Sequence, residues 1–186
     1  MRIISGNFKG KQIIQPVDRF TRPLKDLVKE SIFNILNHSK KINIKLEDAY
    51  VLDLFSGVGS FGLECLSRGV KFVTFVENYK IALDILKKNL INLKSQNNYS
   101  VLKKNIINEL DFTMLNQNFS IIFLDPPYKE KKLDLLLNKI INNKILTDNG
   151  IIIIHRHKKT IDQFPSKLKV IEQKNYGISK IIFLSV

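Results

Sequence analysis

Residues 50–62 read YVLDLFSGVGSFG, and the fold follows from this stretch. Residues 50–55 are too few for a helix and are rich in apolar side chains, which predicts a strand covered on both faces. The glycines that follow predict a tight turn, after which a helix is expected to begin at about Ser60. A strand, a glycine-rich turn and a helix in this order are typical of a nucleotide-binding α/β unit.

The same alternation continues along the chain. Further short segments with apolar and β-branched or aromatic residues predict strands at residues 71–76, 99–103, 120–124 and 150–155. Between them, apolar residues recur at helical spacing, with lysines on the outer face. The clearest of these helical patterns span residues 81–93 and 133–141. Strands that alternate with helices predict an α/β protein with an open, mostly parallel, doubly wound sheet.

The two ends of the chain differ from this middle. Residues 1–15 alternate around two glycines, which predicts a small basic β-hairpin, and residues 24–37 predict an amphipathic helix. After Tyr176-Gly177, residues 180–186 predict a closing strand, paired antiparallel with residues 169–173.

No linker or repeat divides the sequence. We expect one domain over residues 1–186, with residues 1–40 as a hairpin-and-helix extension and residues 41–186 as the core.

Composition excludes several classes of protein. The 186 residues are 44% hydrophobic and 25% charged, as in ordinary globular domains. The single cysteine, Cys65, excludes an intramolecular disulfide and a Cys-rich zinc module, and it fits a reducing compartment. The longest purely aliphatic run, residues 151–154, is far shorter than the roughly 18 residues of a membrane span. Residues 1–12 lack the apolar region of a secretory signal, so we expect a soluble, cytoplasmic protein.

The charge points to a polyanionic partner. Thirty basic and 17 acidic residues give a net charge of +13, which favours nucleic-acid binding. A coding bias toward Lys, Ile and Asn would give the same excess, so charge alone does not decide. The candidate phosphate contacts are Arg2, Lys9, Lys11, Lys25, Lys29 and Arg156.

The glycine-rich turn is the first candidate binding element. Gly57 and Gly59 would let backbone N–H groups approach a ligand closely. Glu77 ends the next predicted strand, about 18 residues beyond Gly59, where an acidic side chain accepts hydrogen bonds from both ribose hydroxyls of an adenosine cofactor. The alternatives are a turn without a ligand and a solvated acid at a strand end.

Three classes of adenosine cofactor bind at turns of this kind. The chain has no GxxxxGK[ST] at this turn, which excludes a P-loop ATPase here, while the spacing still allows NAD. Asp53, just before the turn, would repel a pyrophosphate but suit the ammonium group of a methionine moiety, which favours S-adenosylmethionine. Asn105, after the strand predicted at residues 99–103, would then bind the adenine edge or, equally well, cap a helix.

Asp125-Pro126-Pro127-Tyr128 follows the strand predicted at residues 120–124 and is the sharpest motif in the chain. Two prolines remove two backbone donors, so the segment presents acceptors only. The Asp125 carboxylate and the Pro126 carbonyl can accept both protons of one amino group and direct its lone pair toward a methyl donor. Tyr128 can stack on the base that carries the amine. The alternative is a rigid turn in which Asp125 caps a helix near Lys129.

These motifs resemble class I S-adenosylmethionine-dependent methyltransferases that modify exocyclic amines. More closely, the chain resembles the bacterial RsmD family, which methylates guanine N2 in small-subunit ribosomal RNA. The resemblance extends over nearly the whole sequence. It rests on residues 2–6 with 9–11, residues 21–23, 29–36, 53–64 and 66–69, and on Glu77, Asn105 and residues 125–128.

The resemblance implies a Rossmann-like seven-stranded sheet with its last strand antiparallel, S-adenosylmethionine as donor and ribosomal RNA or small-subunit particles as substrate. It implies catalytic roles for Asp125, Pro126, Pro127 and Tyr128. The implied cofactor contacts are Asp53, Phe55, Gly57, Gly59, Glu77, Asn105, Thr21 and Arg22. The chain departs from the family at His155-Arg156-His157, which replaces a more acidic strand end.

Other functions remain open at this point. An adenine-N6 methyltransferase shares Asp-Pro-Pro-Tyr, and a basic RNA-binding domain could retain the fold without catalysis. A protein glutamine methyltransferase would carry Asn-Pro-Pro-Tyr and a larger amino-terminal domain, and no hydride-transfer residues support an NAD oxidoreductase. The spacing of the three histidines, His38, His155 and His157, does not match that of metal ligands. We therefore expect them at the surface and expect no metal site. We also expect the enzyme to be a monomer.

Overall fold

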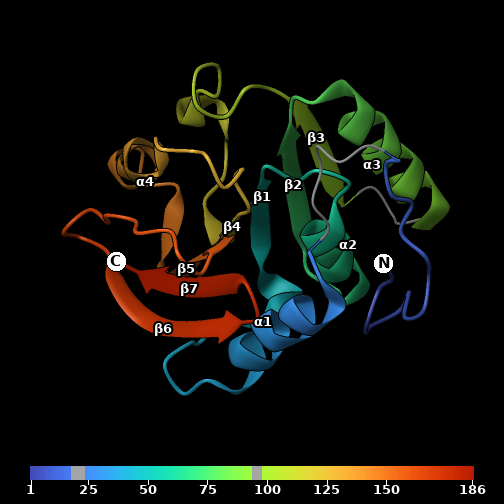
Figure 1. Cartoon of the computed structure of the whole chain (residues 1–186), viewed down its shortest axis with the longest axis horizontal. Coiled ribbons are helices and arrows are strands. Elements are labelled where there is room, and N and C mark those ends of the chain that lie inside the picture. Colours follow the sequence, from blue (N-terminus) through green and yellow to red (C-terminus); the bar gives the residue numbers. More distant parts are fainter. Residues whose placement is uncertain (18–23, 94–97) are drawn as a thin grey trace.

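The computed structural model describes residues 1–17, 24–93 and 98–186 (Figure 1). Its α-helices are α1 (Asp26–His38), α2 (Ser60–Ser67), α3 (Lys80–Leu93) and α4 (Leu133–Asn142), with short 3₁₀ turns η1 (Leu46–Asp48) and η2 (Phe112–Met114). Its strands are β1 (Tyr50–Leu54), β2 (Phe72–Glu77), β3 (Tyr99–Lys103), β4 (Phe119–Leu124), β5 (Leu146–His157), β6 (Lys169–Tyr176) and β7 (Ser179–Ser185).

The strands form one seven-stranded sheet in the order β3-β2-β1-β4-β5-β7-β6. Pairing is parallel from β3 to β5, whereas β7 runs antiparallel to both β5 and β6. The doubly wound sheet and its antiparallel last strand, both expected from the sequence, are therefore confirmed. The order of β1 and β4 is also decisive for function, because these adjacent strands place the turn after β1 beside the turn after β4.

Two buried apolar clusters lie on the two faces of the sheet. One joins alternate strand residues, such as Val51 and Phe123, to apolar side chains of α1, α2 and α3. The other joins the opposite alternation, such as Leu52 and Leu124, to α4 and the segment around η2. Figure 1 accordingly shows α2 and α3 beside β1 to β3 and α4 beside β4 and β5. Burial on both faces explains why the central strands read as nearly continuous apolar runs.

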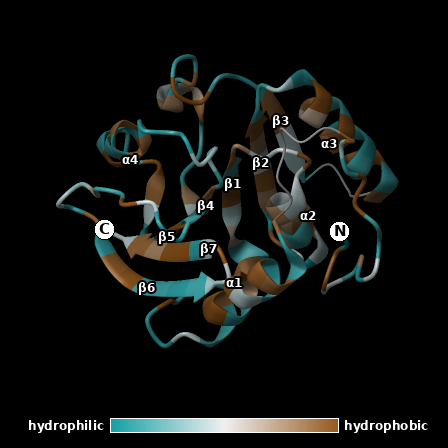
Figure 2. Ribbon diagram, viewed as in Figure 1, coloured by the Kyte–Doolittle hydropathy of each residue, from teal (hydrophilic) through white to brown (hydrophobic). Residues whose placement is uncertain are grey.

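The edge strand differs from the centre of the sheet. Residues of β7 are mostly buried, whereas most of β6 is exposed or half-buried. Figure 2 shows the same contrast, with hydrophobic residues along β7 and hydrophilic ones toward the end of β6. Charged and polar residues on an exposed edge oppose strand pairing with another chain.

The start of β5 is the element that the sequence describes least well. A strand was expected at residues 150–155, but β5 begins earlier, at Leu146, soon after α4 ends at Asn142. The pairing with β4 is irregular here, because Phe119 pairs with Leu146 whereas Ile121 pairs with Ile151. A register shift depends on pairing with a neighbouring strand, so the local sequence does not reveal it.

The amino-terminal segment forms the expected hairpin, although its only β-bridge, within the described residues, joins Arg2 and Gln12. Glu64 of α2 holds this hairpin, because its carboxylate accepts the N–H groups of Ile4 (2.8 Å) and Ser5 (3.0 Å). Lys29 of α1 adds an ion pair to Glu64 at 3.4 Å and donates to the Arg2 carbonyl.

This arrangement corrects one expectation. Lys29 was a candidate phosphate contact, but its side chain is completely buried. Burial lowers the pKa of Lys29, and the nearby Glu64 carboxylate opposes that shift. Lys29 therefore acts in packing the hairpin.

Among the helices in the described ranges, none is both long and apolar enough to cross a bilayer.

Candidate active site

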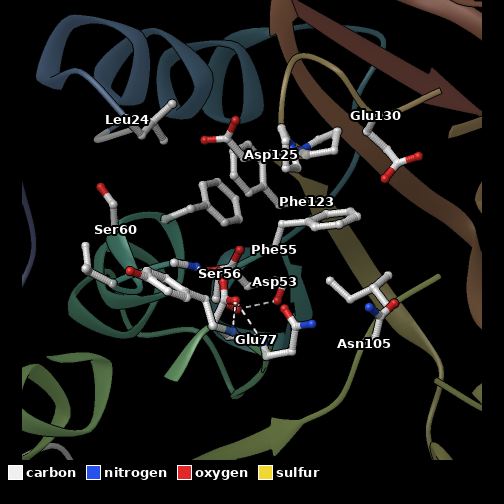
Figure 3. A pocket seen from close by; sticks show the side chains of 18 of the residues that line it. Leu24, Asp53, Phe55, Ser56, Ser60, Glu77, Asn105, Phe123, Asp125 and Glu130 are labelled. Atoms are coloured by element: carbon white, nitrogen blue, oxygen red, sulfur yellow. Dashed lines mark hydrogen bonds between the residues drawn. The ribbon is translucent and has the colours of Figure 1, made fainter. Parts of the chain in front are cut away.

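A cavity of about 730 Å³ opens at the carboxyl ends of β1, β2 and β4. Doubly wound sheets bind ligands at this edge. The expected site residues Asp53, Phe55, Gly57, Glu77, Asn105, Asp125, Pro126, Pro127 and Tyr128 all line it. Figure 3 shows Glu77 toward one end and Asp125 toward the other, with Phe55 between them. The structure thus brings two motifs that lie far apart in sequence to one cavity.

The turn after β1 is built from residues in left-handed backbone conformation. Phe55 has φ of 59°, Gly57 of 55° and Gly59 of 86°. Ser56 fixes the turn to β2, because its hydroxyl donates to the Asp53 carbonyl and accepts from the Val76 N–H. Gly59 does not line the cavity. A side chain there would overlap Leu86 of α3, so this glycine allows close packing of the turn.

Glu77, at the end of β2, organises the turn from the other side. Its Oε2 accepts the N–H of Gly57 at 2.8 Å, and its Oε1 accepts the N–H groups of Asn78 and Tyr79 at 2.8 Å. The carboxylate is therefore a fixed group at the cavity wall and not a freely solvated acid. A carboxylate has about four acceptor positions, and these three bonds leave one of them on Oε2 available to a ligand.

Asp53 is the deepest acidic group of the site. Its side chain is buried, and its Oδ2 accepts the N–H of Gly62 at 3.0 Å. Burial raises the pKa of Asp53 well above its usual value, the Gly62 hydrogen bond opposes this, and the charges of Asp125 and Glu77 raise the pKa further. Three carboxylates around one cavity favour a ligand that carries positive charge.

Asn105 lines the cavity and also caps a turn. Its Oδ1 accepts the N–H groups of Ile107 and Asn108 at 3.1 Å. This is the capping role that the sequence allowed as an alternative to adenine binding. The two roles are compatible, since the cap fixes the side chain at the edge of the cavity.

The Asp-Pro-Pro-Tyr corner follows β4 directly. The helix after it begins at Leu133, so Asp125 does not cap a helix near Lys129. Instead, Asp125 Oδ1 lies 2.9 Å from Nδ1 of His155 on the neighbouring strand β5. The corner is thus an acceptor-rich wall of the cavity that β5 supports.

Comparison with known proteins identifies the chain. Residues 1–185 match the family described as Conserved hypothetical protein 95. The Haemophilus influenzae ribosomal RNA small subunit methyltransferase D is 33% identical over 183 residues, which cover 96% of this chain and 90% of that protein. The chain belongs to the ribosomal RNA small subunit methyltransferase D family. The Bacillus subtilis protein YlbH is 34% identical over 183 residues, which cover 97% of this chain and 96% of YlbH.

A solved structure agrees with this family assignment. The Escherichia coli protein yhhF superposes with a TM-score of 0.79 and 29% identity, over 99% of this chain and 96% of that chain. The agreement includes the amino-terminal region that the sequence treats as an extension of the core. The RsmD-type resemblance drawn from the motifs is therefore confirmed.

Two residues of the β5 end were placed wrongly by the sequence. His155 was expected at the surface, but it is 2% exposed and contacts Asp125 and Ser179. Arg156 was a candidate phosphate contact, but it is buried and paired with Asp162 at 3.0 Å. Both residues lie near the end of β5, after a run of apolar residues. Their contacts with the Asp-Pro-Pro-Tyr corner become visible only once β5 is paired with β4.

Gln15 and Leu24 are among the further residues that line the cavity and that the sequence did not predict. Asn89 of α3 places the first, because its side chain bonds the backbone of Ile14 and the carbonyl of Val58. Thr21 and Arg22, which the sequence assigned to the methionine end of a cofactor, lie outside the described residues. Within the described ranges, no group of three or more His, Cys, Asp or Glu side chains is placed to hold a metal ion.

Proposed function

We propose that this chain transfers a methyl group from S-adenosylmethionine to guanine N2 of small-subunit ribosomal RNA. The observation that carries the proposal is the shared cavity. A turn suited to an adenosine cofactor and a corner suited to an exocyclic amine form its two walls. Membership of the ribosomal RNA small subunit methyltransferase D family supports the same reaction.

The residues present fit S-adenosylmethionine, which supplies an electrophilic methyl group when bound. In the proposed arrangement, Glu77 accepts the ribose hydroxyls, Asn105 and its neighbours border the adenine, and Asp53 attracts the ammonium group. Phe55 and Gly57 complete the wall of the turn. The acidic character of the cavity supports this assignment, since both the sulfonium and the ammonium groups are cationic.

The corner holds the acceptor amine. The Asp125 carboxylate and the Pro126 carbonyl accept its two N–H bonds, and Pro127 keeps the segment rigid. Tyr128 stacks on the base, and its ring packs nearly perpendicular to that of His157, with centroids 5.0 Å apart. Because methyl transfer is an in-line displacement, orientation by these groups supplies most of the catalysis.

The RNA is recognised by a basic surface. Arg2, Lys9, Lys11 and Lys25 remain as candidates, because their side chains are exposed, whereas Lys29 and Arg156 are buried. We propose a monomeric cytoplasmic enzyme that acts on a small-subunit particle. We also propose that residues 1–40 work as an extension of the core, since Ile3, Ile13 and α1 share its buried cluster.

The test is methyl transfer from labelled S-adenosylmethionine to small-subunit RNA of cells that lack this protein, followed by nucleoside mass spectrometry. We expect N2-methylguanosine. Appearance of N6-methyladenosine would instead identify an adenine-N6 enzyme. RNA binding without affinity for S-adenosylmethionine would identify a non-catalytic RNA-binding domain.

The Asp125→Ala variant tests the role of the corner. We expect loss of methyl transfer with nearly unchanged affinity for S-adenosylmethionine, because Asp125 contacts the acceptor amine in this proposal. Asp134→Ala is the matched control, since Asp134 is an exposed carboxylate at the start of α4. Full activity of Asp125→Ala would refute the role assigned to this carboxylate.

A further inference from the structure

The last three residues of β5 each contact the Asp-Pro-Pro-Tyr corner. His155 bonds the Asp125 carboxylate, and the guanidinium of Arg156 donates to the carbonyls of Pro127 (3.1 Å) and Glu130 (3.0 Å). The rings of His157 and Tyr128 pack nearly perpendicular to each other. The end of β5 therefore contacts three of the four residues of the corner.

We propose that His155 is a positioning residue for methyl transfer, acting through Asp125. The proposal rests on the proposed function, in which Asp125 accepts a proton of the target amine. His155 does not line the cavity, so it does not contact a base bound there. Its effect is on the orientation of the carboxyl group.

Two hydrogen bonds fix the imidazole ring. Nδ1 lies 2.9 Å from Asp125 Oδ1, and Nε2 lies 2.9 Å from the Ser179 hydroxyl at the start of β7. An ionised carboxylate only accepts hydrogen bonds, so Nδ1 carries a proton and donates to Asp125. The Ser179 hydroxyl can donate to or accept from Nε2, so this second bond does not depend on whether Nε2 carries a proton. The antiparallel pairing of β5 and β7 places Ser179 opposite His157 and thus near this ring.

The carboxyl group needs such a restraint. The terminal torsion of an aspartate is broad and has no sharply preferred value. Asp125 also lies at the cavity wall with its side chain 15% exposed, so packing alone restrains it less than a core residue. A donor held in the core by two strands fixes one carboxylate oxygen and thereby sets the plane of the group.

A purely structural role explains the contact less well. His155 follows Ile151–Ile154 in a strand buried on both faces, where an apolar side chain would pack without needing partners. A buried imidazole loses its solvation and requires hydrogen bonds to compensate. Here one of the two bonds goes to the acidic residue of the corner.

Two substitutions separate the two bonds of the ring. In His155→Asn, the side-chain nitrogen can occupy the Nδ1 position and still donate to Asp125. In His155→Gln, the nitrogen can occupy the Nε2 position, so the contact with Ser179 is kept and the donation to Asp125 is lost. The two variants thus differ in whether residue 155 can donate to Asp125, while each of them keeps one polar contact.

We expect His155→Gln to lower kcat on the order of 10²-fold, as misplacement of a reacting group does. The KM for S-adenosylmethionine should stay within about threefold, because no cofactor contact changes, and His155→Asn should recover most of kcat. Equal loss of kcat in both variants, in proportion to their loss of Tm, would mean a structural role and overturn the proposal. Wild-type kcat in His155→Gln would also overturn it.

Asp125→Ala, measured in the same series, separates this proposal from the proposed function. If Asp125→Ala is inactive while His155→Gln is fully active, only the positioning role of His155 is disproved. If Asp125→Ala is fully active, the function assigned to the Asp-Pro-Pro-Tyr corner is disproved. If neither His155 variant folds, Ser179→Ala is the deciding variant, because it removes only the hydrogen bond between Ser179 and Nε2 of His155. We expect a lower kcat with unchanged affinity for the cofactor. An unchanged kcat would overturn the proposal.

Discussion

Glu77 accepts the N–H of Gly57 at 2.8 Å, and this bond joins the end of β2 to the turn after β1. Both Glu77 oxygens are held by backbone N–H groups, so the carboxylate is fixed before a ligand binds. A fixed acceptor requires little ordering when ribose hydroxyls bind to it. The same residue therefore shapes the turn and, in the proposed function, recognises the cofactor.

Glu77→Ala should weaken S-adenosylmethionine binding by at least about tenfold, because it removes a charged acceptor worth roughly 1.5–3 kcal/mol. Glu77→Gln should lie between this variant and the wild type, since its amide keeps one oxygen acceptor. Calorimetry measures the dissociation constants. Glu47→Ala is the control, because Glu47 is an exposed acid of η1. An unchanged constant for Glu77→Ala would disprove the ribose contact.

Asp53→Asn should stabilise the ligand-free protein while weakening cofactor binding. The pKa of Asp53 is raised in the folded state, mainly by burial, so the ionised carboxylate is unfavourable there at neutral pH. The amide keeps an acceptor for the Gly62 N–H. We expect a higher Tm, by about 2–4 °C for each kcal/mol gained, together with a weaker affinity for S-adenosylmethionine. A lower Tm with unchanged affinity would contradict both parts.

The raised pKa of Asp53 also predicts a pH dependence. Between the usual pKa of an aspartate and the raised value, the folded state binds more protons than the unfolded state. The free energy of unfolding should therefore fall as pH rises through this range, while affinity for the cationic cofactor rises. Scanning calorimetry and titration calorimetry across pH measure the two trends. Asp53→Asn should remove this pH dependence from the free energy of unfolding and from the cofactor affinity. If both trends persist in the variant, they arise from other titratable groups.

Glu64→Ala should destabilise the protein by about 3–5 kcal/mol, because it leaves the completely buried Lys29 ammonium without its counter-charge. It also removes the acceptor for the N–H groups of Ile4 and Ser5. Urea unfolding measures the loss. The control is Glu172→Ala, which breaks partly exposed pairs with Lys41 and Lys174 and should cost at most about 1 kcal/mol. Similar losses in the two variants would mean that burial of the Lys29–Glu64 pair is unimportant.

Gly62→Ala tests the packing of α2 on β2. A Cβ atom at this position would lie 2.2 Å from Cε1 of Phe75, so α2 or the ring must move. Overpacking of this kind costs about 1–3 kcal/mol. Moving α2 would also disturb the Gly62 N–H bond to Asp53 and lower cofactor affinity. The double variant Gly62→Ala/Phe75→Leu should recover part of the stability; additive losses would show that the two positions do not interact.

Most of the fold could be predicted because its signals are local. The run of apolar residues in β1 and the glycines after it place a strand, a turn and a helix start at Ser60, as observed. The irregular pairing at the start of β5 could not be predicted, since it depends on the register with β4. For the same reason, the expected surface position of His155 was wrong: a polar residue at a strand end looks solvated until its neighbour is known.

The sequence by itself determined the chemistry available to this protein: the acidic residues, the glycine turn and the acceptor-only corner after β4. The tertiary structure decided which of these groups meet, because β1, β2 and β4 are adjacent in the sheet and end at one cavity. It also decided which basic residues are buried. Lys29 and Arg156 resemble the other cations in sequence, but buried carboxylates hold them inside, and an ion pair between distant residues depends on tertiary contacts.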